Sequence, residues 1–258
     1  MPLISVLTTT REDSSGELWA ARAARSIANQ ALLDGWELEW LIQSDGTPRA
    51  ASAYQDIANS IVSCPTSSAG LAHRAGVAVA RNAALSRARG DLVCTLDDDD
   101  ELTTDSIILR HRPLAESPSL FWCAGLMRHF DPDNGLVHTE PQDPPFGLIT
   151  PEVALAHLAP NRCFPVYAAT LLMSTQALRA IGGWPAYING EDNVMMSALT
   201  GVFDGWYLNE VVYEYHRRHQ SLSTNEASSQ FIEIYRPAQY QRTLAAIELL
   251  RPQGPGLT

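Results

Sequence analysis

Along the first hundred residues, two hydrophobic patterns alternate. Short apolar runs typical of buried strands occur at residues 3–8, 38–43, 60–64 and 91–96. Segments with apolar residues at helical spacing lie between these runs, over residues 17–33, 50–59 and 73–88. Strand and helix in alternation predict βα units around a mainly parallel sheet, which is an α/β fold.

After the first hundred residues the pattern is less regular. Strand-like apolar runs occur at residues 119–127 and 166–173. A helix is expected to begin near Gly190, and a longer one is expected over residues 227–250. A chain of this length can bury a substantial core, and we expect one domain over residues 1–258.

The most unusual stretch is GDLVCTLDDDDEL at residues 90–102, where an apolar strand ends in the four carboxylates Asp97 to Asp100. Unit charges about 6 Å apart repel by roughly 3 kcal/mol at an effective dielectric of about 20, so this turn needs solvent or a cation around it. By itself the stretch fits a solvated acidic loop as well as a cradle for a divalent metal. Its position favours a ligand site, because open α/β sheets bind ligands outside the carboxyl ends of their strands.

Composition and charge exclude several classes of function. The formal net charge of −11 argues against a general binder of nucleic-acid phosphates. All 18 basic residues are arginine, which excludes a Walker P-loop, a kinase-type ATP lysine and a pyridoxal Schiff base. The cysteines form no CxxC pair, so neither a zinc knuckle nor a dithiol redox motif is expected.

The cellular compartment is predicted from two further features of the chain. No stretch approaches the roughly 20 apolar residues that span a bilayer. The start of the chain has no basic segment before its apolar run, and acids follow that run directly. It therefore resembles a first strand more than a signal peptide, and we expect a cytoplasmic protein.

Four segments together resemble the family-2 glycosyltransferases of the GT-A fold. They are ISVLTTTRED at residues 4–13, IQSDGTP at 42–48, GVAVARNAALSRARGDLVCTLDDDDEL at 76–102 and IGGWPAYINGEDNVMMSAL at 181–199. The resemblance implies a Rossmann-like, mainly parallel central sheet with helices on both faces. It also implies three regions, namely a nucleotide-sugar-binding half at 1–101, an acceptor-binding half at 102–225, and a C-terminal helix and tail at 226–258.

The resemblance also implies the reaction. The expected enzyme moves one sugar from a UDP- or dTDP-type nucleotide sugar to a hydroxyl or amine of a small-molecule or glycan acceptor. Mn²⁺ or Mg²⁺ is the expected cofactor, because a metal between carboxylate and phosphate oxygens stabilises the diphosphate leaving group as its charge grows.

By the same resemblance, the acidic turn supplies the metal and ribose contacts. Asp99 is the expected direct metal ligand, Asp97 is a second candidate ligand, and His219 is expected to reach the metal. Either Asp97 or Asp98 is expected to hold the ribose hydroxyls. Asp97 and Asp99 share one face of an extended segment, whereas Asp98 and Asp100 face the other way. Asp100 is expected to cap the following helix or to turn outward.

Further contacts to the nucleotide-sugar donor are expected at the carboxyl ends of the other strands, along the same rim of the sheet. Asp45 matches the acid that contacts the nucleotide base, because a carboxylate can accept a base N–H; the alternative is a turn-forming role before Gly46. Thr9 and Arg11 stand where family members enclose the base. Arg81 matches the donor-site arginine, and the alternative is a pairing with an acid at the sheet edge.

The segment NGEDN matches the acidic pair that supplies the catalytic base. Asp192 is the expected general base and Glu191 is expected to orient the acceptor; the alternative is that both acids simply favour a helix start. No second nucleophile is evident beside them, which favours single displacement with inversion. Trp184 and Tyr187 are candidates for stacking on the acceptor.

Two other functions remain open from the sequence. A nucleotidyltransferase that makes sugar nucleotides shares the architecture of this rim, but it would need a glycine-rich first loop and usually a lysine. This chain has TTTRED in that loop and no lysine. A non-catalytic module with a structural calcium site explains the acidic turn but leaves the Glu-Asp segment unexplained.

Overall fold

The centre of the molecule is a mixed β-sheet. The computed structural model describes residues 1–11, 17–131, 135–139, 146–158, 166–187, 189–217 and 226–251. The strands are β1 (Leu3–Thr10), β2 (Glu37–Ser44), β3 (Thr66–Gly70), β4 (Leu92–Thr95), β5 (Glu101–Leu102), β6 (Trp122–Asp131), β7 (Gly135–Thr139), β8 (Gly147–Ile149), β9 (Leu172–Ser174) and β10 (Gly205–His216). The sheet order is β3-β2-β1-β4-β9-β6-β10-β5, with β7 beside β6 and β8 beside β10.

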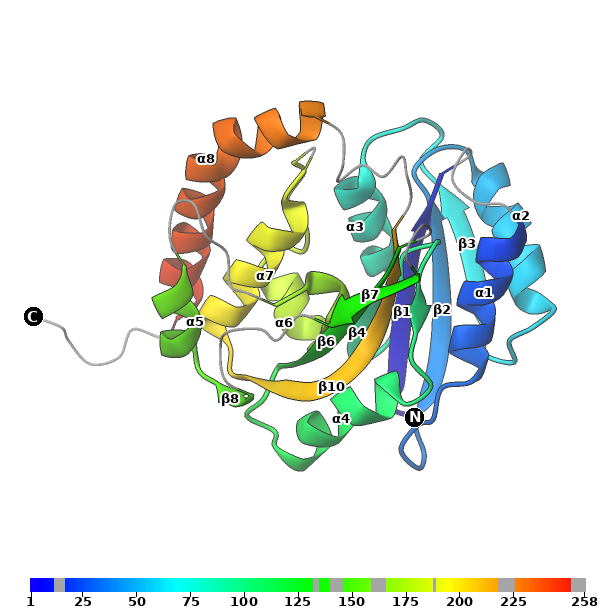
Figure 1. Ribbon diagram of the computed structural model, residues 1–258, viewed down its shortest axis with the longest axis horizontal. Helices are drawn as coiled ribbons and strands as arrows, with labels where there is room; N and C mark the ends of the chain where they lie inside the picture. Colours follow the sequence, from blue (N-terminus) through cyan, green and yellow to red (C-terminus); the bar gives the residue numbers. More distant parts are fainter. Residues whose placement is uncertain are drawn as a thin grey trace, which may run out of the picture.

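Helices cover both faces of this sheet (Figure 1). They are α1 (Glu17–Ala28), α2 (Pro48–Asn59), α3 (Val77–Arg87), α4 (Ser106–Glu116), α5 (Pro151–His157), α6 (Thr175–Ala180), α7 (Glu191–Val202) and α8 (Glu226–Leu250), with a 3₁₀ turn at Ala168–Thr170. Helices α1 and α2 lie on one face, and α3, α6 and α7 lie on the other. The expected α/β architecture with helices on both faces is therefore confirmed.

Strand direction divides the sheet into two parts. In the first part, β3, β2, β1 and β4 are all parallel neighbours, as the alternating pattern predicts. In the second part, β9 lies antiparallel between β4 and β6, and β6 is parallel to β10. Strands β1, β2, β4, β6 and β10 therefore run in the same direction, and their carboxyl ends lie along one edge.

Two hydrophobic cores hold the layers together. On one side, Ala20, Ala23 and Ile27 of α1 pack against Ile4 and Val6 of β1. The spacing of these helix positions is the 3–4 residue period that puts side chains on one face. The other core lies under α3, α6 and α7. Since the central parallel strands β1 and β4 are covered on both faces, the buried parts of their sequences are mostly apolar.

One strand was predicted at the wrong place. The apolar run at residues 60–64 instead begins in the turn that follows α2, because the amides of Ile61 and Val62 both donate to the carbonyl of Ala58, at 2.9 Å each. The side chains of Ile61 and Val62 pack partly buried against the core, which explains their apolar character. The real strand, β3, follows at TSSAG. It lies at the edge of the sheet, where no apolar alternation is needed.

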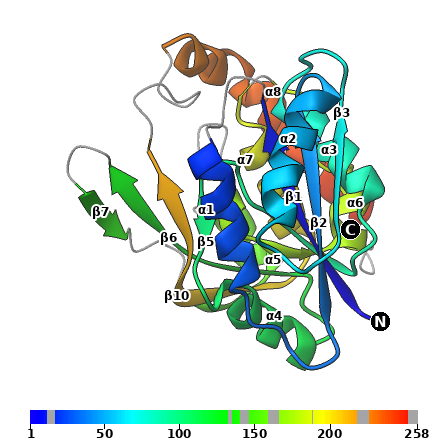
Figure 2. The same ribbon diagram turned by 90° about the vertical axis from the view of Figure 1, so that its right-hand side faces the viewer.

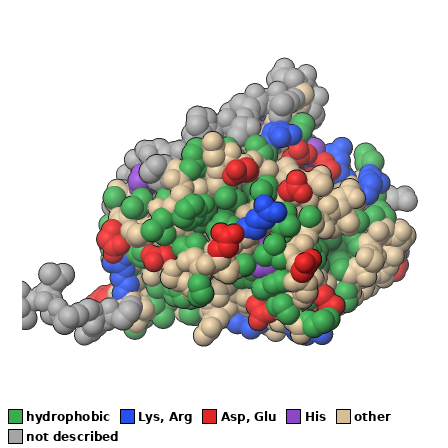
Figure 3. Space-filling model, turned by 90° about the horizontal axis from the view of Figure 1, so that it is seen from below, with side chains coloured by type: hydrophobic (Ala, Val, Ile, Leu, Met, Phe, Trp, Pro, Cys, Tyr) green, Lys and Arg blue, Asp and Glu red, His purple; other side chains and the backbone are tan. Residues whose placement is uncertain are grey.

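The outside of the molecule shows three further features. Strands β6 and β7 form a hairpin that extends away from the helical layers (Figure 2). On the face seen from below, acidic and basic side chains are interspersed with apolar ones (Figure 3). Within the described ranges, no helix combines the length and the apolar character that crossing a membrane requires.

Candidate functional site

Helix α3, the acidic turn after β4 and the start of α7 meet around one arginine. The Arg81 guanidinium donates from Nη2 to Asp97 Oδ1 at 3.0 Å, and from Nη1 to Glu191 Oε1 at 3.1 Å and to Asp192 Oδ1 at 2.6 Å. Arg81 pairs with three acids, and its role at the donor site stays a prediction. The structure thus brings four of the predicted site residues together, from three separate parts of the chain.

The electrostatics of this group distinguish its two α7 acids. Burial by itself would lower the pKa of Arg81, but the three carboxylates outweigh burial and raise that pKa, so the guanidinium stays charged. Burial, with repulsion from Asp192, raises the pKa of Glu191 to about 7. The Glu191 side chain is 8% exposed and that of Asp192 is 38% exposed. Asp192 is therefore the acid that an incoming group can reach.

Burial alternates along the acidic turn. Asp97 and Asp99 are partly exposed, whereas Asp98 and Asp100 are buried. Burial alternates as expected, but in a turn and not in an extended segment, because the Asp100 amide donates to the Asp97 carbonyl at 3.2 Å. Asp97 and Asp99 offer partly exposed carboxylate oxygens, which are the donor atoms that Mn²⁺ and Mg²⁺ prefer. His219, the third predicted metal ligand, lies outside the described residues.

Asp100 has a structural role different from the predicted one. It neither caps α4 nor turns outward, because it is 1% exposed and fully engaged with β10. Its Oδ2 accepts from the Tyr213 hydroxyl at 3.0 Å, and its Oδ1 accepts from the backbone amide of His216 at 2.8 Å. The Tyr213 oxygen also accepts from the Asp97 amide at 3.1 Å. Strand β10 therefore fixes both ends of the acidic turn.

Asp45 connects two of the rim segments. Its Oδ1 accepts from the amides of Ala75 at 2.7 Å and Gly76 at 2.9 Å, and its own amide donates to the carbonyl of Thr10 at 2.8 Å. Gly76 has a φ of 99°, a conformation that favours glycine, and it directly precedes α3. Asp45 therefore helps to set the position of the helix that carries Arg81.

The two residues expected to enclose the base lie at the end of β1. Thr9 was expected in the turn after the strand, but it lies within β1, where it is in register with Gln43 of β2. Arg11 directly follows the strand and is partly exposed. Since β1 and β2 end together, both residues lie on the same rim as Asp45.

Asn82 and Trp184 form a contact that the sequence did not reveal. Asn82 Nδ2 donates to the carbonyl of Trp184 at 2.6 Å, and the Trp184 amide donates to Asn82 Oδ1 at 3.0 Å. The Trp184 indole Nε1 in turn donates to Asp192 Oδ1 at 3.0 Å. Trp184 is 1% exposed, so the expectation that it stacks on an acceptor is wrong. Tyr187 is partly exposed and remains an acceptor-side candidate.

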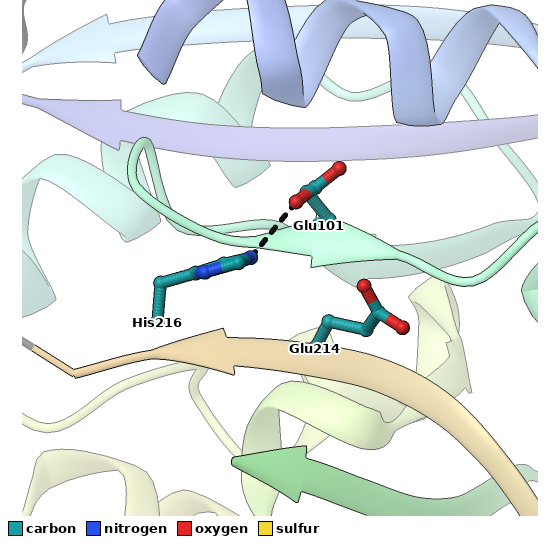
Figure 4. A group of neighbouring side chains, drawn as sticks. All are labelled: Glu101, Glu214 and His216. Atoms are coloured by element: carbon teal, nitrogen blue, oxygen red, sulfur yellow. Dashed lines mark hydrogen bonds and ion pairs between the residues drawn. The ribbon is translucent and has the colours of Figure 1, made fainter. Parts of the chain in front are cut away.

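A second cluster of ionisable side chains lies beside the acidic turn, and Figure 4 shows its three members. His216 Nε2 lies 2.8 Å from Glu101 Oε1, and a carboxylate oxygen of Glu214 lies within 4.8 Å of a ring nitrogen of His216 and of a carboxylate oxygen of Glu101. Arginines already neutralise the two carboxylates: Arg22 Nε lies 3.3 Å from Glu101 and Arg128 Nη1 lies 3.0 Å from Glu214. We therefore interpret this cluster as an ion-pair network.

Comparisons with known proteins identify the family and the fold. A family model described as Glycosyl transferase family 2 matches residues 6–182. No curated protein matches the chain. The S. aureus TarS 1-349 structure in complex with UDP-GlcNAc is 17% identical, with a TM-score of 0.66 over 96% of this chain and 72% of that one. The complex with UDP has a TM-score of 0.65 at 17% identity, over 96% of this chain and 65% of that one.

The likeness to TarS shows the fold. It places this chain among proteins with the GT-A fold, and the expected fold class is confirmed. Against the longer S. aureus TarS structure, with a TM-score of 0.61 and 17% identity, the match covers 96% of this chain and 43% of that one. The family match ends at residue 182, so the α7 acids lie beyond it.

Proposed function

Because the chain belongs to glycosyl transferase family 2, and is therefore a glycosyltransferase, we propose that it transfers one sugar from a nucleoside-diphosphate sugar of the UDP or dTDP type. The acceptor is a hydroxyl or amine of a small molecule or glycan. The titles of the TarS complexes name UDP and UDP-GlcNAc, which supports a donor of this chemistry. The observation that carries the proposal is Arg81, which joins the acidic turn to the α7 acids.

The donor binds to the half of the chain that holds the rim, residues 1–101. Asp99 and Asp97 would hold Mn²⁺ or Mg²⁺, and the bound cation would supply positive charge to stabilise the diphosphate leaving group. Asp97 or Asp98 holds the ribose hydroxyls. The base contacts come from the ends of β1 and β2, which lie side by side in register. The residues assigned to the base are Thr9, Arg11 and Asp45.

The acceptor binds to the half formed by residues 102–225, next to α7. Its hydroxyl or amine attacks the anomeric carbon, the bond from that carbon to the phosphate oxygen breaks, and the electron pair leaves with the diphosphate. Asp192 takes the acceptor's proton as general base, because its carboxylate is the accessible one of the pair. A single displacement of this kind inverts the configuration at the anomeric carbon.

Calorimetry tests this proposal most directly. UDP and dTDP are titrated into the protein with and without Mn²⁺, and a panel of nucleotide sugars is then screened for slow, metal-dependent hydrolysis. Nucleotide binding that requires Mn²⁺ is the expected result. Metal binding that is indifferent to the nucleotide would instead favour a structural cation site. With the best donor, NMR of the first product should show inversion of the anomeric configuration.

A further inference from the structure

Two donors converge on one oxygen of the proposed base. Asp192 Oδ1 accepts from Arg81 Nη1 at 2.6 Å and from Trp184 Nε1 at 3.0 Å. Both of these contacts go to Oδ1, and neither goes to Oδ2. Arg81 alone is a poor constraint on this carboxylate, because its Nη1 is shared with Glu191. The indole N–H adds a second hydrogen bond, which reaches Oδ1 from a different side chain. Two hydrogen bonds to the same oxygen limit how far the carboxylate can rotate.

The indole that makes this contact is itself held firmly. The side chain of Asn82 binds both the amide and the carbonyl of Trp184. The preceding Gly183 has a φ of 65°, and a Cβ there would lie 2.3 Å from Asn82 Oδ1, so the turn closes tightly on α3. The ring is buried in the same hydrophobic core as Met195 and Met196 of α7. Trp184 therefore cannot change its orientation without disturbing several contacts.

From this geometry we propose that Trp184 is a positioning residue for the transfer reaction. Its indole N–H, together with Arg81, keeps Oδ1 of Asp192 engaged, so that Oδ2 is the oxygen directed to the acceptor and takes its proton. The inference rests on the proposed function, in which Asp192 is the general base. Fixing a reacting group in its productive orientation is worth a large rate factor, because misorientation must otherwise be corrected in each turnover.

The test is Trp184→Phe, which keeps an aromatic ring in the core but removes the N–H. Losing a hydrogen bond to a charged group corresponds to a kcat about ten-fold to a hundred-fold lower. The KM for the nucleotide sugar should stay unchanged, because the contact is to the base and not to the donor. A purely structural role would lower the melting temperature and leave kcat of the folded enzyme near wild type.

Trp122→Phe is the matched control. Trp122 is also buried, and its Nε1 donates to the carbonyl of Phe203 at 2.9 Å. It begins β6, so it lies at the opposite end of the strands from the acidic turn. The control should lose a comparable amount of stability and keep its kcat. Equal kcat values for the Trp184 and Trp122 variants would overturn the inference.

A double-mutant cycle separates this inference from the proposed function. In an Asp192→Asn background, Trp184→Phe should cause no further loss of kcat, because the residue acts through the carboxylate. If Asp192→Asn lowers kcat strongly but Trp184→Phe lowers kcat by the same factor in both backgrounds, only the positioning role is refuted. If Asp192→Asn leaves turnover unchanged, the proposed base and the inference both fail.

A second variant covers the case in which Trp184→Phe does not fold. Asn82→Ala removes the two hydrogen bonds that hold the Trp184 backbone, so the indole N–H is retained but its position is held less firmly. It should lower kcat in the same direction, by a smaller factor, with the donor KM preserved. A folded Asn82→Ala enzyme with wild-type kcat would contradict the inference.

Discussion

Arg81→Met is the substitution whose effect can be worked out most fully from the structure. It removes the cation that the carboxylates of Asp97, Glu191 and Asp192 share. Glu191 is the acid most affected, because its side chain is only 8% exposed. Removing one partner of a buried ion pair costs about 3–5 kcal/mol of stability, since the other charge is left uncompensated. The carboxylates of Asp97 and Asp192 are both more than a third exposed, so losing their contacts to Arg81 adds little to the loss of stability, because solvent screens them.

The loss of unfolding free energy caused by Arg81→Met should depend on pH in a defined direction. The pKa of Glu191 is already raised to about 7 by burial and by Asp192, and the arginine opposes that rise. Without the arginine, that pKa rises further. As the pH rises above 7, the wild-type Glu191 ionises beside Arg81, whereas the variant must either keep Glu191 protonated or bury an uncompensated charge; at lower pH Glu191 is protonated in both proteins and the penalty fades. The destabilisation should therefore be largest at about pH 8 and clearly smaller at about pH 5.5.

Urea unfolding at the two pH values measures this effect. Arg128→Met is the control, because Arg128 pairs with Glu214 at a partly exposed position. That pair should contribute at most about 1 kcal/mol. Arg81→Lys should restore part of the stability, since a single ammonium keeps the charge but cannot reproduce the forked contacts. A loss no greater than that of the control, or a larger loss at pH 5.5 than at pH 8, would refute the reasoning.

Three further outcomes are expected. Asp99→Asn should abolish Mn²⁺-dependent transfer with little change in melting temperature. The control Asp105→Asn, which changes an exposed acid before α4, should leave both transfer and melting temperature near wild type. Near wild-type transfer by Asp99→Asn in limiting Mn²⁺ would contradict the metal assignment. Asp192→Asn should keep donor affinity by calorimetry but lose about 10² to 10⁴ in kcat, and unchanged turnover would rule out this base. His111 is buried against Trp36, with no hydrogen-bond partner for either ring nitrogen among the described residues, and burial lowers its pKa below 6.5. Its neutral form supports the fold above about pH 6.5, so the melting temperature should fall as the pH drops below that value, and His111→Phe should flatten this dependence.

Much of the fold could be predicted from local pattern alone. The strands that became β1, β2 and β4 were predicted because parallel strands covered on both faces are nearly continuous in apolar residues. The alternating burial of the acidic turn was predicted from an extended segment, but residues 97–100 form a turn in which the Asp100 amide donates to the Asp97 carbonyl, so the prediction was met for a different physical reason. Strand β3 was missed because its partner is supplied by β2, and an edge strand needs no apolar pattern of its own.

The candidate site was predictable as a set of residues but not as an arrangement. The acidic turn, Arg81 and the α7 acids were all identified by motif, yet nothing local indicates that one guanidinium joins them across 111 positions of the chain. Likewise, Asp100 looked like a cap because its partner Tyr213 arrives on β10 from far along the sequence. Element type follows from spacing within one or two turns, which the sequence by itself determines. Hydrogen bonds between distant side chains depend on how the layers pack, and only the tertiary structure decides them.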